Sequence, residues 1–171
     1  MTVTKREILS RLPEYTDQWQ VVRQTQYVPD IVNEIVTAHR LFGSYYDCFS
    51  SLFWSDDVSE IADDLYHFCK ANIRYREETV NRQTTALPTG ILTRGYGDCK
   101  HYASFVGGVL ASLNRKHKAG IKWWYCFAGY KPGAVEPYHV FVAVNDGREE
   151  IWIDPTPGSG ATPTLFIKRS V

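Results

Sequence analysis

The chain has 171 residues, which fits about one domain, and its 19 basic side chains balance 19 acidic ones. With 44% hydrophobic and 22% charged residues, the composition is typical of a folded globular protein and excludes wholesale disorder. Nucleic-acid-binding proteins usually carry a basic excess or a dense basic stripe. The sequence has neither feature, so we expect no nucleic-acid partner.

The N-terminal segment has no continuous apolar stretch, because Ser10 and Arg11 interrupt it. No run of about 18 apolar residues occurs, so the sequence predicts no transmembrane helix and no membrane partner. We therefore expect a cytoplasmic protein, although a later destination such as a virus particle would leave no mark on the sequence. The four cysteines form no Cys-x-x-Cys pair, and we expect free thiols rather than disulfides or a zinc site.

The first half of the chain shows helical periodicity. It predicts an amphipathic helix from about Val28 to Phe42, with Gly43 as the C-terminal stop. A second helix is predicted from about Asp57 to Asn72, with Ser55 or Asp56 as its N-cap. The apolar stripes of these helices consist of Ile31, Ile35, Ala38 and Phe42 in the first, and Val58, Ile61, Leu65 and Phe68 in the second.

Residues 77–90 are polar and predict a long connecting loop, of a length more typical of functional segments than of plain connectors. A third helix is predicted from about Asp98 to Asn114. Its apolar stripe consists of Tyr102, Val106, Val109, Leu110 and Leu113. Gly107 and Gly108 lie inside this helix, where each glycine costs about 1 kcal/mol relative to alanine. We infer that another element packs very close to the helix at these glycines.

The second half of the chain is rich in β-branched and aromatic residues. We expect strands over residues 121–130, 138–144 and 149–153, and a short one over 165–168. The segment Asn145-Asp146-Gly147 supplies a turn between the second and the third strand. Because helices come first and strands follow, the sequence predicts an α+β fold in which N-terminal helices pack on an antiparallel sheet.

Cys99 is the cysteine whose surroundings predict reactivity. The segment Gly95-Tyr96-Gly97-Asp98 leads into the third helix, so Cys99 lies in its first turn, at the positive end of the helix dipole. That position favours the thiolate, which is the nucleophilic form of cysteine. Cys48, Cys69 and Cys126 fall within apolar segments, and we interpret them as core residues.

A base and an orienting group for Cys99 are available on two neighbouring strands. Strand alternation places His139 and Phe141 on one face, and the hairpin brings Asp154 alongside, where its carboxylate can accept a hydrogen bond from the imidazole. His101 is interpreted as a surface residue. A metal site built from Cys99, His101 and His139 lacks the usual ligand spacing, so no metal is predicted.

Three segments together resemble the transglutaminase-like core of the papain-like cysteine enzymes. They are Gly97-Asp98-Cys99-Lys100-His101-Tyr102-Ala103, Tyr138-His139-Val140-Phe141-Val142-Ala143-Val144 and Trp152-Ile153-Asp154-Pro155-Thr156. The resemblance covers roughly residues 61–156. Within the family, the chain resembles the small stand-alone bacterial and phage members. It implies Cys99 as nucleophile, His139 as base and then acid, Asp154 as the orienting carboxylate, and no cofactor. Phe141 stands where many members have tryptophan, a departure that concerns the acyl pocket more than the triad.

The implied reaction is acyl transfer through a thioester on Cys99, with a protein or peptide as substrate. We expect hydrolysis of a peptide, side-chain or isopeptide amide, because water is always available as the acceptor. The backbone N–H of Cys99 is a candidate oxyanion donor, and so is Gln83, the latter on position alone.

Two alternatives stay open. Transamidation of a protein glutamine differs from hydrolysis only in the acceptor of the acyl group. A non-catalytic binding or structural module that keeps the fold is the third hypothesis. We expect a single domain over residues 1–171, with a helical extension over 1–55 and the catalytic core over 56–171. The sequence predicts no oligomeric state.

Overall fold

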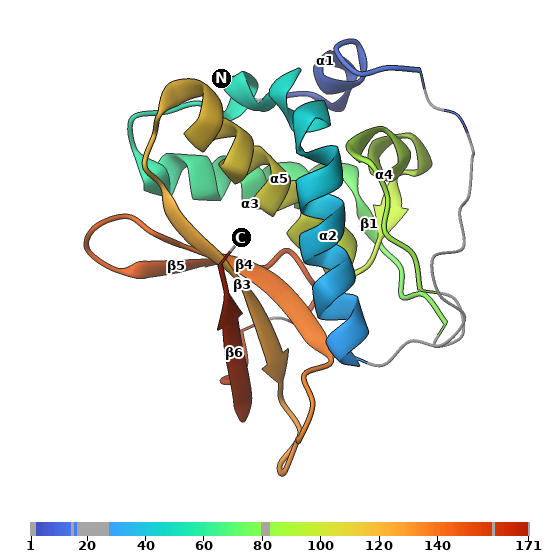
Figure 1. The fold of residues 1–171 in the computed structure, drawn as a ribbon, viewed down its shortest axis with the longest axis vertical. Helices are drawn as coiled ribbons and strands as arrows, with labels where there is room; N and C mark the ends of the chain where they lie inside the picture. Colours follow the sequence, from blue (N-terminus) through green and yellow to red (C-terminus); the bar gives the residue numbers. More distant parts are fainter. Residues whose placement is uncertain (1–2, 15, 17–27, 80–82, 159, 171) are drawn as a thin grey trace.

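The protein consists of helices packed on one face of an antiparallel sheet (Figure 1). The computed structural model describes residues 3–14, 16, 28–79, 83–158 and 160–170, with the backbone alone for residues 28–32. Its elements in chain order are α1 (Lys5–Leu9), α2 (Val28–Asp47), η1 (Ser50–Phe53), α3 (Val58–Asn72), β1 (Arg74–Tyr75), α4 (Pro88–Arg94), β2 (Tyr96–Gly97), α5 (Cys99–His117), β3 (Lys122–Gly129), β4 (His139–Asn145), β5 (Glu150–Ile153) and β6 (Leu165–Arg169). None of the described helices has the length and apolar character needed to cross a membrane.

The main sheet has the strand order β5-β4-β3-β6, and each strand is antiparallel to its neighbours. This confirms the antiparallel sheet predicted from the sequence. Alternation along β4 places Val140 and Val142 in the main core beneath the helices. It places Phe141 and Ala143 in a second cluster on the opposite face, which we call the outer face. The main core also takes in Ile8 of α1, so the N-terminal segment helps to complete it.

Helix α2 is longer than predicted, because it continues through Gly43 to Asp47. The prediction of Gly43 as a stop is therefore wrong. Arg115 of α5 donates from Nη2 to the Gly43 carbonyl at 2.8 Å, which ties this part of α2 to the neighbouring helix. Ile35 of the predicted stripe is buried, whereas Phe42 is 38% exposed and does not join the core. The side chain of Ile31 lies outside the described residues.

Helix α3 begins one residue later than predicted and has a different cap. The carboxylate of Asp57 accepts from the backbone N–H of Ser59 at 2.8 Å and so satisfies a donor of the first turn. Neither Ser55 nor Asp56 caps the helix. Ser55 instead accepts from the Asp57 N–H at 3.1 Å and donates to Glu60 at 2.7 Å. The predicted stripe of α3 is confirmed, since Ile61, Leu65 and Phe68 are buried.

The predicted loop over residues 77–90 ends three residues early, because α4 begins at Pro88. Proline at the first helical position lacks an N–H that would have no partner there, so it fits the start of a helix. Helix α4 ends at Arg94 and is capped by Gly95, whose φ of 69° is the left-handed conformation that glycine adopts without strain. The chain then enters β2, which pairs in parallel with β1.

The two glycines inside α5 mark close contacts, as the sequence predicts. A Cβ at Gly107 would lie 2.8 Å from Cζ of Tyr125 on β3, and one at Gly108 would overlap the ring of Tyr46 on α2. Such approaches exclude any side chain larger than hydrogen unless a buried tyrosine moves. The glycines therefore allow α5 to pack between the sheet and α2.

Replacing Gly108 by alanine is expected to destabilise the protein by about 2 kcal/mol. Overpacking costs about 1–3 kcal/mol, which exceeds the gain of less than about 1 kcal/mol in helix propensity. Gly43→Ala is the matched control, since a Cβ there would lie an ordinary 3.5 Å from the Arg115 guanidinium. We expect that variant to be stabilised by about 0.5–1 kcal/mol. Urea unfolding of both variants tests the packing, and equal stabilities would contradict it.

Candidate active site

Cys99 is the first residue of α5, with Asp98 as its N-cap. The β1–β2 pair fixes the chain just before it, because Arg76 donates its backbone N–H to the Gly97 carbonyl at 2.8 Å. Gly97 must be glycine, since a Cβ there would lie 2.7 Å from Cβ of His101. The thiol of Cys99 is half-buried and lies at the positive end of a helix of 19 residues.

A cluster of charged residues surrounds this helix start. We call Glu78, Asp98, Lys100 and His101 the α5 charge cluster. Lys100 is 4% exposed and forms ion pairs with Asp98 and, at 3.0 Å, with Glu78. His101 Nδ1 lies 2.8 Å from Oδ1 of Asp98. Burial alone raises the pKa of Asp98, but the hydrogen bond from His101 and the charge of Lys100 outweigh burial and lower that pKa to about 2.

The prediction of His101 as a surface residue is wrong. The side chain is 3% exposed, and its Nε2 lies 3.4 Å from the hydroxyl of Thr84 in the preceding loop. Both ring nitrogens therefore have polar neighbours, Asp98 in the α5 charge cluster and Thr84 in the loop. Among the described residues, no group of three or more His, Cys, Asp or Glu side chains is placed to hold a metal ion.

His139 and Asp154 are brought together by the β4–β5 hairpin. His139 is the first residue of β4, and Asp154 directly follows β5, whose Ile153 pairs with Val142. The His139 Nε2 lies 2.7 Å from Oδ2 of Asp154, and both side chains are buried except for about a tenth of their surface. The other carboxylate oxygen, Oδ1, accepts the backbone N–H of Thr156 at 3.2 Å. Asp154 therefore fixes the orientation of the imidazole.

The other imidazole nitrogen, Nδ1, is left for Cys99, because Nε2 is bound to Asp154. Burial lowers the pKa of His139, but hydrogen bonds with Asp154 and with Cys99, together with their negative charges, outweigh burial. The result is a His139 pKa raised to about 9. An imidazole with that pKa is largely protonated at neutral pH and can serve as a counter-ion for a thiolate.

Stability is expected to depend on pH through His139. Its pKa of about 9 in the folded chain exceeds the ordinary 6.5, and this difference corresponds to about 3 kcal/mol. Because the folded pKa is the higher one, the stabilisation is complete below pH 6.5 and is lost as the pH rises through 9. Urea unfolding at about pH 6 and about pH 9.5 should show this loss in the native protein and not in His139→Ala. The same loss in both proteins would contradict it.

Two tyrosines that the sequence reasoning missed flank this group. The Tyr130 ring lies 5.8 Å from the His139 ring, and burial and the Asp154 charge raise the Tyr130 pKa to about 12. Tyr75 packs on Tyr102, and burial and the charge of Cys99 raise its pKa as well. Both phenols therefore stay protonated at neutral pH. The sequence could have located Tyr130 near His139. Tyr130 is the last residue of the predicted strand 121–130, and that strand pairs in antiparallel fashion with the predicted strand 138–144, which begins beside His139.

Gln83 is placed in the loop that precedes α4. Its amide nitrogen donates to the carbonyl of Thr79 at 3.0 Å and points to that of Glu78 at 3.5 Å. The amide thus contacts the loop's own backbone. Its role as an oxyanion donor stays a prediction.

The remaining cysteines differ from one another in exposure. Cys69 and Cys126 are buried, as predicted, and burial raises the pKa of both thiols, that of Cys126 to about 12. The prediction of Cys48 as a core residue is wrong, because it directly follows α2 and is exposed. All four cysteines are free thiols, and Cys48 provides an exposed reference for the reactivity of Cys99.

Comparison with known proteins gives a likeness of fold. No family model matches the sequence, and no curated protein matches it. The structure is similar to the crystal structure of a "putative protease" from Parabacteroides distasonis ATCC 8503, with a TM-score of 0.57 over 80% of this chain and 12% sequence identity. The chain spans 27% of the length of that protein. At this identity the likeness shows that the two chains share the arrangement of helices and sheet.

Proposed function

We propose that the protein is a cysteine-dependent enzyme that hydrolyses amide bonds in a protein or peptide. Cys99 is the nucleophile, His139 the base and then the acid, and Asp154 the group that orients His139. The observation that carries the proposal is the hydrogen bond of 2.7 Å between His139 Nε2 and Asp154 Oδ2, together with the hydrogen bond between the same imidazole and Cys99. The structural likeness to a "putative protease" supports the same class of reaction.

The proposal includes a transglutaminase-like, papain-like core over residues 56–171, with residues 1–55 as a helical extension. Its support is the order of elements: a long helix that begins at Cys99, followed by strands that carry His139 and end before Asp154. That order supports the roles proposed for Cys99, His139 and Asp154, because the three residues come from the ends of α5, β4 and β5.

In the resting enzyme Nδ1 of His139 already holds the proton of the Cys99 thiol, so acylation begins from a thiolate–imidazolium pair. The thiolate sulfur attacks the amide carbonyl carbon, and the backbone N–H of Cys99 at the α5 N-terminus stabilises the developing oxyanion. The carbon–nitrogen bond then breaks, and His139 donates its proton to the leaving amine. An acyl thioester on Cys99 remains, while Asp154 holds the imidazole in place throughout.

Hydrolysis and transamidation diverge at the second step. In hydrolysis His139 takes a proton from water, the oxygen attacks the thioester, and the carbon–sulfur bond breaks to release a carboxylic acid and the Cys99 thiolate. In transamidation a substrate amine replaces water. Hydrolysis is the proposed reaction, because water needs no acceptor site and a transamidase must exclude it.

The test uses fluorescein-labelled casein as the substrate and dansylcadaverine as an alternative acceptor. We expect the native protein to release labelled peptides, and Cys99→Ala to release none. Incorporation of dansylcadaverine without peptide release would establish transamidation instead. A native protein that does neither, and whose Cys99 forms no thioester detectable by mass spectrometry, would be a binding or structural module.

A further inference from the structure

Exposed aromatic side chains lie on the outer face of the sheet, on β5 and β6, and directly before β4. Trp152 is 40% exposed, Phe166 is 36% exposed and Tyr138 is 50% exposed. Trp152 and Phe166 lie 5.5 Å apart, measured between ring centroids, and cover the buried Phe141 at 4.8 and 6.0 Å. We call Tyr138, Trp152 and Phe166 the outer aromatic patch. In the described part of the chain the helices lie on the other side of the sheet (Figure 1).

The outer aromatic patch is joined to His139 by continuous ring contacts. On one side, the Phe141 ring is stacked 5.8 Å from the His139 ring and lies under Trp152. On the other side, Tyr130 lies 5.8 Å from His139 and 6.2 Å from Tyr138. The imidazole is therefore the centre of an aromatic surface whose exposed parts extend to both sides of it.

We infer that the outer aromatic patch binds apolar side chains of the substrate, and that the enzyme acts on peptides with aromatic or large aliphatic residues near the reacting amide. This inference rests on the proposed function, because it assumes that the amide lies between Cys99 and His139. A peptide held there must pass beside the imidazole, and the rings next to it bury an apolar side chain favourably.

The size of the outer aromatic patch fits a peptide better than a second copy of the chain. An aromatic side chain buries about 150–250 Å² in full, so three rings exposed by a third to a half offer roughly 200–300 Å². A stable protein–protein interface needs about 800 Å² on each partner. The patch thus offers enough area for one or two side chains and too little for a dimer.

The test measures peptide binding by fluorescence anisotropy with the Cys99→Ala protein, which cannot turn over its ligand. The probes are two fluorescein-labelled pentapeptide amides, Gly-Phe-Ala-Phe-Gly and Gly-Ser-Ala-Ser-Gly. We expect the first to bind at least about tenfold more tightly, because it can bury phenylalanine rings where the second carries serines. Introduced separately into the Cys99→Ala protein, Trp152→Ala and Phe166→Ala should each remove most of that preference.

Trp54→Ala provides the matched control. Trp54 is 37% exposed and stacks on His117, the last residue of α5. A helix of this length places it roughly 27 Å from Cys99, so its removal should leave the preference unchanged. Thermal unfolding of each variant identifies any that is not folded, and the two patch variants lie on different strands, so one can replace the other.

Equal binding of the two peptides, or a preference that survives both patch substitutions, would overturn the inference while leaving the proposed function intact. Suppose instead that the native protein hydrolyses neither peptide nor casein but still prefers the phenylalanine peptide. That result would overturn the proposed function, while the inference of a peptide-binding surface would stand. Sedimentation that shows a dimer lost on Trp152→Ala would assign the patch to a second copy and overturn the inference.

Discussion

Replacement of His139 by alanine is expected to lower the rate of amide hydrolysis by about 10³–10⁴-fold. The imidazole is hydrogen-bonded to both Cys99 and Asp154, so its loss removes the group that holds the thiol proton and donates it to the leaving amine. Release of labelled peptides from casein at neutral pH measures the effect. The residual rate would reflect the oxyanion donors and substrate binding alone.

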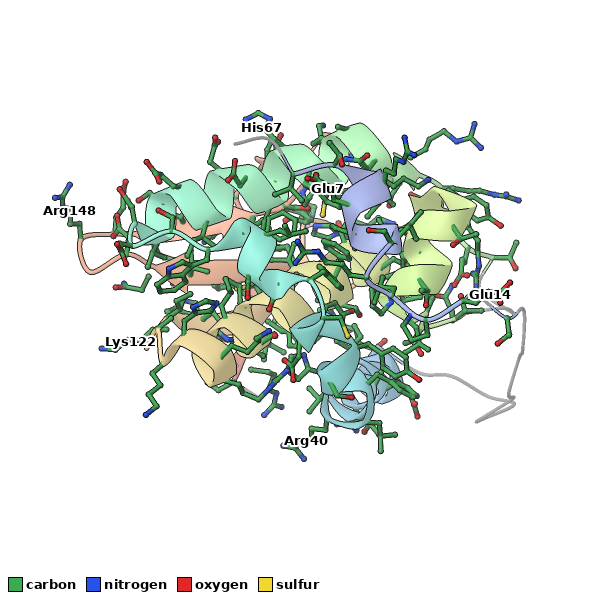
Figure 2. All side chains as sticks on the ribbon, turned by 90° about the horizontal axis from the view of Figure 1, so that it is seen from above. Glu7, Glu14, Arg40, His67, Lys122 and Arg148 are labelled. Carbon is green, nitrogen blue, oxygen red and sulfur yellow. The ribbon has the colours of Figure 1, made fainter. Side chains whose placement is uncertain are left out.

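His67→Ala is the control for this substitution. His67 points outward from α3 (Figure 2) and pairs with Asp63 at the surface at 3.3 Å, so we expect its variant to keep the native rate. If His139→Ala retained more than about a tenth of the native rate, His139 would not act as the base and acid of the reaction.

Replacement of Lys100 by methionine is expected to destabilise the fold by about 3–5 kcal/mol, because it leaves two carboxylates without their buried counter-ion. Lys100 bonds both Asp98 and Glu78, and Glu78 also accepts from the Thr84 backbone N–H at 2.6 Å. The lysine thus connects Glu78, and through it Thr84, to the start of α5. Urea unfolding measures the loss.

Two comparisons separate the charge effect from the loss of a lysine. Lys70→Met removes an exposed lysine of α3 and should change the free energy of unfolding by less than about 0.5 kcal/mol. Adding Glu78→Gln to Lys100→Met should recover part of the stability, because one uncompensated charge is removed. If the Lys100→Met protein is as stable as Lys70→Met, Lys100 does not stabilise the fold as the counter-ion of the α5 charge cluster.

The fold could be predicted where hydrophobic periodicity is long and regular. Helices α3 and α5 and strands β3 to β5 lie within a few residues of their predicted positions, because each buries one continuous face. Helix α4 was missed, since it has only seven residues and includes Pro88 and Gly90. The end of α2 was misplaced because a bond from Arg115, 72 residues away, holds the helix together at Gly43.

The candidate site could be predicted in part, from local signals. A glycine-rich lead into a helix identified Cys99, and strand alternation with a hairpin turn brought His139 beside Asp154. The burial of His101 could not be read from the sequence, because Asp98 and the distant Thr84 determine it together. Long-range pairs of this kind have no periodicity, and only the folded chain reveals them.

Alkylation of the thiols by iodoacetamide as a function of pH, with mass spectrometry to locate the modified cysteine, tests the central claim most directly. The buried Cys69 and Cys126 should stay unmodified in the folded protein, and the exposed Cys48 reports the rate of an ordinary thiol. We predict that Cys99 reacts faster than Cys48 near about pH 6 and that His139→Ala abolishes this advantage. If Cys99 reacts no faster than Cys48 at that pH, no thiolate–imidazolium pair exists and the proposed catalysis is contradicted.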